Sequence, residues 1–246
     1  MENITQTVAK PSYTKAYKKY LIILLVMLLF VTQAATDIFV PGLSIMAREF
    51  GVSPATMNMT ISYYVCAQAI LFLLMGIISD VAGRRNTILI SLIISVVATF
   101  AISVGHDIYL IIFYRVLQAL GSGAVYIVSR LIIKEVYEPH EQLTMTGLFM
   151  LGLVISPAIA PIVGAFIINH LDWRATFTFI GASLFILTFF SFFMIKETNL
   201  EINKYRVEFR LSKIFINYYS VITNGMFIRY LFVVGGTFAS FYAFIA

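Results

Sequence analysis

Charged residues are scarce in this chain of 246 residues: they make up 12% of it, whereas hydrophobic residues make up 60%. Soluble domains carry about 25% charged residues, so a soluble globular fold is excluded at this length. The lone cysteine, Cys66, excludes a disulfide within the chain. The three histidines, His106, His140 and His170, all fall in polar breaks. A histidine relay and a metal cluster are therefore not expected.

Motifs of nucleotide-driven and hydrolytic chemistry are also missing. The chain has no G-x-x-x-x-G-K-[ST] phosphate loop, so ATP is not expected as an energy source. Neither a serine elbow nor H-E-x-x-H occurs. The basic residues do not form a water-exposed domain that could bind nucleic acid. We expect a protein that lies in the lipid bilayer, is not an enzyme, and needs no cofactor.

Long apolar runs dominate what is present. Six runs reach the length of about 20 residues that crosses a bilayer, at 20–42, 56–79, 86–105, 108–130, 143–168 and 174–195. Barrel strands would alternate in runs of about ten residues, so the expected fold is all-α and integral to the membrane. The predicted parts are a cytoplasmic tail (1–19), a six-helix bundle (20–195), a cytoplasmic linker (196–227) and the start of a seventh helix (228–246).

The basic residues predict the orientation of the chain. Of 17 lysines and arginines, only Arg48 and Arg174 fall on the side opposite the N-terminus, and Arg115 falls inside a run. Because basic residues are enriched in cytoplasmic loops, we expect the N-terminus to be cytoplasmic.

The stretch GIISDVAGRRNTIL interrupts the apolar pattern with Gly76, Asp80, Gly83, Arg84 and Arg85. A topology signal alone accounts for the arginines but not for the acid or the glycines. Gly76 is expected to let another helix approach closely, and Gly83 to let the backbone reverse. Asp80 and Glu135, the latter just after the fourth run, can pair with the arginines. Such pairs contribute about 0.2–1 kcal/mol each, enough for a conformational latch.

Asp37 is the only acid well inside an apolar run. An ionisable group in hydrocarbon costs at least about 2.5 kcal/mol, so it usually faces a water-filled cavity or a partner. It is predicted to carry protons; the alternative is an interfacial aspartate beside Pro41. Arg115 is predicted to hold Asp37 deprotonated in one state, or else to reach the outer interface. Its helical face is expected to line a substrate cavity with Gln118, Ser122 and Tyr126.

Small residues and prolines mark the fifth run. Gly152 and Gly164 are expected to allow close helix packing, and Pro157 and Pro161 to bend the helix into a hinge.

These motifs together resemble the major facilitator superfamily, whose members carry G-x-x-x-D-x-x-G-R-R/K between their second and third spans. ATDIFVPGL, FYRVLQALGSGAVYIVSRLIIKE, SPAIAPIVGA and DWRATF are most similar to drug–proton antiporters of the bicyclomycin-resistance (Bcr/CflA) branch. The sequence departs from that pattern at Ile77, Ser156, Ala160 and Ala165.

The resemblance implies a proton-coupled antiporter of a bacterial inner membrane. Such a protein exports drugs or other small amphipathic compounds by alternating access, driven by the proton gradient. Members have twelve or more spans, so this sequence resembles an N-terminal half that needs a C-terminal six-helix half. A membrane enzyme, a transport-inactive fragment or partner subunit, and a nutrient transporter of the same fold are the alternatives.

Overall fold

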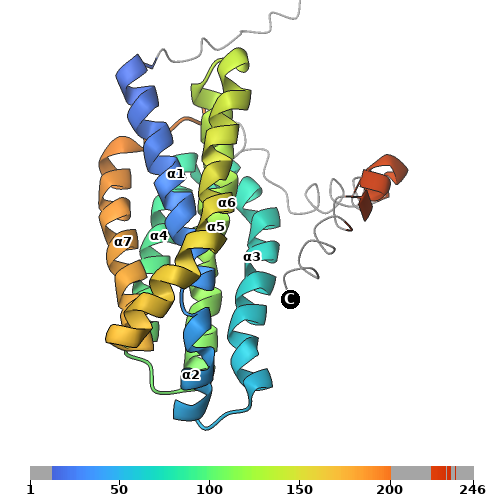
Figure 1. The fold of residues 1–246 in the computed structure, drawn as a ribbon. Helices are drawn as coiled ribbons and strands as arrows, with labels where there is room; N and C mark the ends of the chain where they lie inside the picture. Colours follow the sequence, from blue (N-terminus) through green and yellow to red (C-terminus); the bar gives the residue numbers. More distant parts are fainter. Residues whose placement is uncertain (1–12, 201–222, 231, 234–235, 237–246) are drawn as a thin grey trace, which may run out of the picture. The chain divides into compact units, whose positions relative to one another are not determined.

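Helices are the only regular secondary structure among the residues that the structure describes, which are 13–200, 223–230, 232, 233 and 236 of a computed structural model (Figure 1). Its helices are α1 (Lys15–Asp37), the 3-10 helix η1 (Val40–Gly42), α2 (Leu43–Glu49), α3 (Pro54–Ala82), α4 (Arg84–Ser103), α5 (Ile108–Val136), α6 (Pro139–His170) and α7 (Trp173–Met194). The chain divides into two compact units, Met1–Ile202 and Asn203–Ala246, and all of these helices belong to the first.

The second unit is described only in part. Residues 225–230, 232, 233 and 236 are helical. The predicted linker, 196–227, and the predicted seventh helix, 228–246, fall largely outside the described residues, so their boundaries stay predictions.

Polar side chains in the short breaks set the helix starts. Asp107 Oδ1 accepts hydrogen bonds from the N–H groups of Tyr109 (2.7 Å) and Leu110 (3.1 Å) at the start of α5. Thr14 and Ser53 cap α1 and α3 in the same way. The first N–H groups of a helix have no partner within the helix. These caps bind such groups and therefore explain why α1, α3 and α5 begin where they do.

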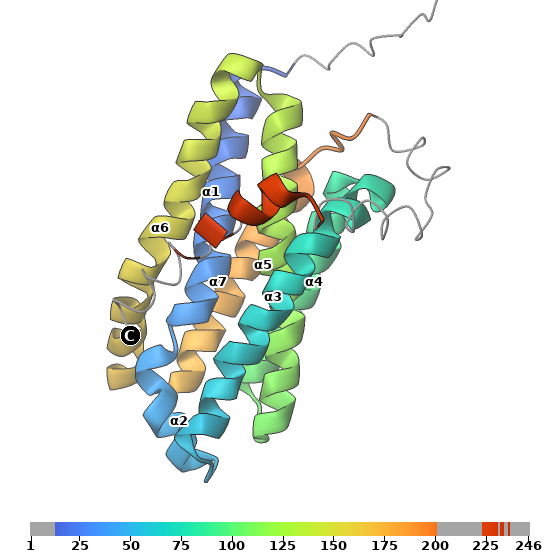
Figure 2. The ribbon, with the colours of Figure 1, turned by 90° about the vertical axis from the view of Figure 1, so that its right-hand side faces the viewer.

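Within the first unit, α1 packs against α5, α6 and α7. Helix α3 packs on α5, and α4 packs on both α5 and α7. Figures 1 and 2 show these helices running roughly along one direction, with the short α2 at one end. Leu21, Leu25 and Leu28 of α1 are fully buried in the main apolar core. A smaller core beside α2 contains Phe39 and Trp173.

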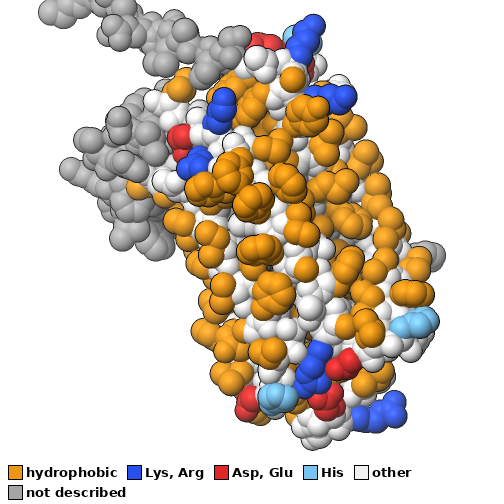
Figure 3. Space-filling model, turned by 90° about the vertical axis from the view of Figure 1, so that its left-hand side faces the viewer, with side chains coloured by type: hydrophobic (Ala, Val, Ile, Leu, Met, Phe, Trp, Pro, Cys, Tyr) orange, Lys and Arg blue, Asp and Glu red, His pale blue; other side chains and the backbone are white. Residues whose placement is uncertain are grey.

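Six segments of the described chain are long and apolar enough to cross a membrane. The first, Lys15–Glu49, joins α1, η1 and α2, and the others are the five helices from α3 to α7. In Figure 3 hydrophobic side chains cover the middle of the visible face, while charged side chains gather toward its two ends. This is the surface of a multi-pass membrane protein, and the predicted all-α fold class is confirmed.

Candidate functional site

Arg115 lies inside the bundle and is fully buried. Its Nη1 donates hydrogen bonds to the carbonyl oxygen of Ala35 on α1 (2.8 Å) and to Gln118 Oε1 (2.7 Å). The rings of Phe39 and Tyr64 lie over the guanidinium, with centroids 4.3 and 4.5 Å from Cζ. Aromatic faces attract a desolvated cation. Arg115 is therefore a buried anchor between α5 and α1, and the alternative of a side chain reaching the interface does not describe this structure.

Asp37 is the last residue of α1 and is half-buried. The sequence placed it well inside a helix, but α1 ends there because the chain turns into η1, which contains Pro41. The apolar segment nevertheless continues to Glu49. Among the described residues Arg115 forms no ion pair; it is bonded to the α1 backbone two residues before Asp37 and acts on that carboxylate electrostatically. The two predicted partners are thus neighbours without being paired.

Gln118 and Ser122 do not line an open cavity in this structure, since each is only 1% exposed. Gln118 Nε2 donates to Thr99 Oγ1 on α4 at 2.8 Å, and Ser122 Oγ donates to the carbonyl oxygen of Ala119 within α5 at 2.9 Å. The predicted stripe is instead turned into the bundle, because buried polar groups require hydrogen-bond partners and α4 supplies one. Gln118 consequently positions Arg115.

Tyr126 is the more open member of this set. It is half-buried and stacks on Phe72 of α3, with ring centroids 4.7 Å apart. The guanidinium of Arg130 lies 5.7 Å from its ring centroid. A role in contacting substrate stays a prediction.

In a protein that joins this chain to a C-terminal six-helix half, we expect Arg115→Lys to impair transport far more than Arg48→Lys. Lysine keeps the charge but loses the planar fork that bonds Ala35 and Gln118 together. Among the described residues, the exposed Arg48 side chain on α2 donates only to the Ser44 carbonyl oxygen. Drug-efflux rates of the two variants, at matched expression, measure the difference. Equal rates would show that Arg115 supports the fold but has no specific part in transport.

The predicted latch contacts are present where α3, α4 and α5 end. Arg84 Nη1 lies 2.6 Å from Asp80 Oδ1, and Arg84 Nη2 lies 3.0 Å from Glu135 Oε1. The Arg84 side chain is only 6% exposed, and its Nη1 also donates to Ser79 Oγ at 2.9 Å. One arginine therefore ties three helices together.

Arg85 differs from the prediction, because its side chain bonds backbone rather than an acid. Its Nε donates to the carbonyl oxygen of Ile195 (2.9 Å) and its Nη2 to that of Phe192 (2.8 Å). The last carbonyls of a helix lack partners within it and carry partial negative charge. Arg85 therefore caps the end of α7.

Residues after α7 complete this cluster, and the sequence reasoning missed them. Glu197 accepts hydrogen bonds from the N–H groups of Arg84 (3.0 Å) and Arg85 (3.2 Å) at the start of α4. Thr198 Oγ1 donates to Glu135, and Asn199 Nδ2 donates to the Asp80 carbonyl oxygen at 3.0 Å. An acid directly after the sixth apolar run was the signal available in the sequence.

Gly76 and Gly83, the two glycines of GIISDVAGRRNTIL, have different surroundings in the structure. Gly83 is the single residue between α3 and α4, and its φ of 95° lies in the region that favours glycine. The prediction of a tight reversal there is confirmed. A Cβ at Gly76 would meet only Ile127 Cγ2, at an ordinary 3.9 Å. The predicted close helix approach at Gly76 is therefore wrong, because the neighbouring helix leaves room for a methyl group.

Arg84→Gln should lower the free energy of unfolding by about 1–3 kcal/mol, because it leaves Asp80 and Glu135, which are partly exposed, without their shared cation. Arg130→Gln is the matched control, since Arg130 is exposed. Thermal unfolding of the two variants in detergent gives the comparison. Indistinguishable midpoints would show that the cluster contributes nothing to stability.

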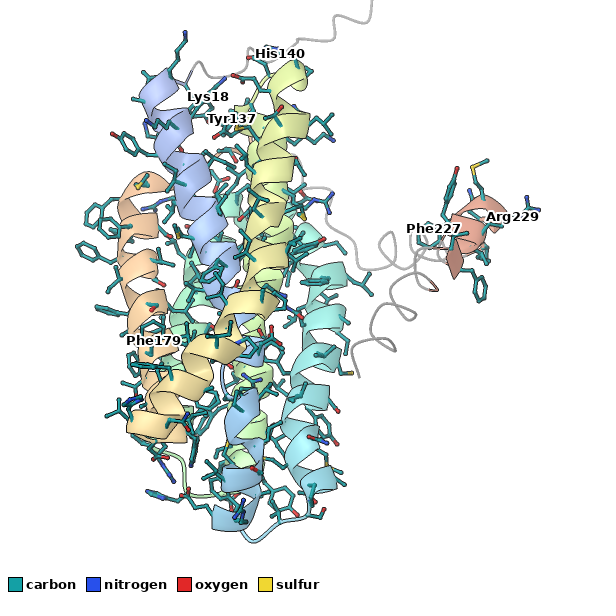
Figure 4. The ribbon with its side chains drawn as sticks, viewed as in Figure 1. Lys18, Tyr137, His140, Phe179, Phe227 and Arg229 are labelled. Atoms are coloured by element: carbon teal, nitrogen blue, oxygen red, sulfur yellow. The ribbon has the colours of Figure 1, made fainter. Side chains whose placement is uncertain are left out.

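A second contact joins the start of α1 to the connection between α5 and α6. Lys18 Nζ lies 2.7 Å from Glu141 Oε2, and the Tyr137 hydroxyl donates to the Lys18 carbonyl oxygen at 2.5 Å. Figure 4 shows Lys18, Tyr137 and His140 at the same end of the bundle. Burial raises the pKa of Tyr137 above its ordinary value, so its phenol stays protonated and remains a donor at physiological pH.

Helix α6 packs closely on α1 through its small residues. A Cβ at Gly152 would lie 2.7 Å from the Val26 carbonyl oxygen, and one at Gly164 would lie 1.7 Å from that of Ile38. The predicted close packing is therefore present. The helix runs through Pro157 and Pro161 without ending, and Figure 1 shows it bending partway along its length. A hinge function for this bend stays a prediction.

Comparison with known proteins gives the family. The model of the Major Facilitator Superfamily matches residues 25–246, and the chain belongs to this superfamily. Multidrug resistance protein D of Escherichia coli is 28% identical over 160 residues, which are 65% of this chain and 41% of that protein. Multidrug resistance protein MdtL of Salmonella dublin is 27% identical over 165 residues, 67% of this chain and 42% of that protein.

The MFS-type transporter phiD of a fungal species is 28% identical over 166 residues, 67% of this chain and 25% of that protein. The chain thus matches less than half the length of these curated relatives. Among solved structures, a bacterial homologue of the human lysosomal transporter Spinster superposes with a TM-score of 0.68 at 15% identity, covering 76% of this chain and 44% of that one. The proton:xylose symporter XylE gives a TM-score of 0.63 at 13% identity, covering 76% of this chain and 46% of that one. These similarities establish the fold.

Proposed function

We propose that the chain forms the N-terminal half of a proton-coupled antiporter that exports drugs or other small amphipathic compounds by alternating access. The observation that carries this proposal is the hydrogen bond of the buried Arg115 to Ala35, two residues before Asp37. It keeps a cation within electrostatic reach of a membrane-embedded carboxylate without an ion pair. Such a carboxylate can release a proton when water enters the site and take one up when the site closes.

Drug export is supported by relatives that are named for multidrug resistance. The motif match to drug–proton antiporters favours the Bcr/CflA branch. We further propose that the proton gradient supplies the energy without a cofactor, and that the protein lies in a bacterial inner membrane with a cytoplasmic N-terminus.

Transport is proposed to need more than residues 1–246. In this fold the substrate site lies near the membrane midplane between repeated halves, and the chain matches about two fifths of the bacterial relatives. We use "complete transporter" for this chain joined to a C-terminal six-helix half.

The proposed function is tested by expressing the complete transporter and residues 1–246 separately in a drug-hypersensitive bacterium. Ethidium accumulation should fall only with the complete transporter, and a protonophore should restore it. Export by residues 1–246 alone would overturn the requirement for a second half. Sugar uptake without ethidium export would favour the nutrient transporter, whereas inactivity of both proteins would favour a transport-inactive membrane protein.

A further inference from the structure

Two glutamines join α1 and α3 beside the Asp37–Arg115 site. Gln68 Nε2 donates a hydrogen bond to Gln33 Oε1 at 3.0 Å. Gln33 is half-buried, and Gln68 is buried with 9% of its surface still exposed. Gln68 is the fifteenth residue of the 29-residue α3, which places it near the middle of a membrane span.

Helical spacing relates this pair to the two residues of the proposed proton site. Gln33 lies four residues before Asp37 on α1, a rise of about 6 Å along the same face. Gln68 follows Tyr64 at the same spacing on α3, and the Tyr64 ring covers the Arg115 guanidinium. The pair therefore lies one helical turn from the Asp37–Arg115 site on two separate helices.

The pair keeps unused hydrogen-bonding capacity. Each glutamine amide has a carbonyl oxygen and two N–H donors, and their mutual bond uses one oxygen and one N–H. A carbonyl oxygen and further N–H groups remain, and these atoms are not among the sealed, unpartnered polar atoms of the described chain. Lipid tails offer no hydrogen bonds, so polar side chains at this depth face the bundle interior or a water-filled cavity.

We propose that Gln33 and Gln68 form a hydrogen-bonding subsite for an uncharged amide or hydroxyl group of the transported compound. The proposal rests on the export function proposed above and specifies its substrate class. A group that both donates and accepts matches the oxygen and N–H groups that the pair leaves available. Compounds that carry such a group bind at the subsite, whereas a cation that lacks one interacts with Asp37 alone.

Transport selectivity tests this assignment. Gln68→Met in the complete transporter removes both polar atoms at similar side-chain length. Gln142→Met is the control, since within the described part of the chain the Gln142 side chain bonds only the Lys134 and Tyr137 carbonyl oxygens. Chloramphenicol carries an amide and hydroxyls, whereas the cation tetraphenylphosphonium carries no hydrogen-bonding group. Gln68→Met should raise the KM for chloramphenicol about fivefold, the loss of one neutral hydrogen bond, and leave that for tetraphenylphosphonium unchanged. Equal losses for both drugs, or no loss for either, would overturn the proposal.

Cysteine labelling tests the subsite without relying on export. With Cys66 replaced by alanine, Gln68→Cys should react quickly with a charged, membrane-impermeant thiosulfonate, and chloramphenicol should slow the reaction. Ile70→Cys is the control: Ile70 is 53% exposed but lies about 200° around α3 from Gln68, so chloramphenicol should not change its reaction rate. An unreactive Gln68→Cys, or one that chloramphenicol fails to protect, contradicts the subsite. A wild-type protein that exports neither drug contradicts the proposed function instead, and the labelling still decides the subsite.

Discussion

Replacing Asp37 by asparagine should abolish proton-coupled export by the complete transporter while leaving the protein folded in the membrane. Asparagine keeps the shape of the side chain and removes the carboxylate that Arg115 influences. The other acids of the described membrane segments lie at a segment's end or within two residues of it: Glu49, Asp80, Glu135 and Glu141. The expected loss in pH-driven efflux is at least about a hundredfold, the scale of losing a proton-transferring group.

Asp172→Asn is the matched control for this variant. Asp172 is exposed and directly precedes α7, and its Oδ2 lies 3.6 Å from Arg174 Nη1. Its substitution should leave efflux from vesicles with an imposed pH gradient unchanged. If Asp37→Asn retained the wild-type rate in the same vesicles, Asp37 would have no part in coupling, and the alternative of an interfacial aspartate would stand.

Gly164→Ala should cause the largest loss of stability of any alanine substitution of a described glycine. The new Cβ would lie 1.7 Å from the Ile38 carbonyl oxygen, a contact with rigid backbone rather than with a movable side chain. Either α1 or α6 must shift, which costs about 3 kcal/mol or more. The shift would also displace Asp37, the neighbour of Ile38, so transport should fall together with stability.

Gly147 supplies the control on the same helix, because a Cβ there meets nothing within 4 Å. Gly147→Ala should be neutral or stabilising by up to about 1 kcal/mol, since alanine favours helix. Both effects are measured as shifts in the thermal unfolding midpoint of the detergent-solubilised variants, with size-exclusion chromatography as the readout of the folded fraction. Similar midpoints for Gly164→Ala and Gly147→Ala would show that the contact between α1 and α6 is not tight.

The fold was predictable because a bilayer imposes a strong rule on the sequence: a crossing helix needs about 20 apolar residues. The six described membrane segments correspond to the six predicted runs. Local features were predictable for a related reason. Asp80 and Arg84 are four residues apart and meet through helical spacing alone, and Gly83 has to reverse the chain between two adjacent helices.

The contacts that sequence reasoning missed join residues far apart in the chain. Gln118 donates a hydrogen bond to Thr99 on α4, and Glu197 accepts one from the Arg84 N–H group at the start of α4. Gln33 and Gln68 meet across α1 and α3. Helical periodicity identifies a shared face, but the neighbour of that face depends on how the helices pack. For the same reason the predicted cavity stripe on α5 was turned into the bundle.

Coupling between drug and proton movement can be measured directly in proteoliposomes that hold the complete transporter. Ethidium is added on one side, and a trapped pH-sensitive dye reports proton flux on the other. The wild-type protein should move protons against the direction of ethidium only when ethidium is present, and Asp37→Asn should move none. Ethidium transport without proton movement, or equal proton movement in wild type and Asp37→Asn, would contradict a proton-coupled exporter built around Asp37 and Arg115.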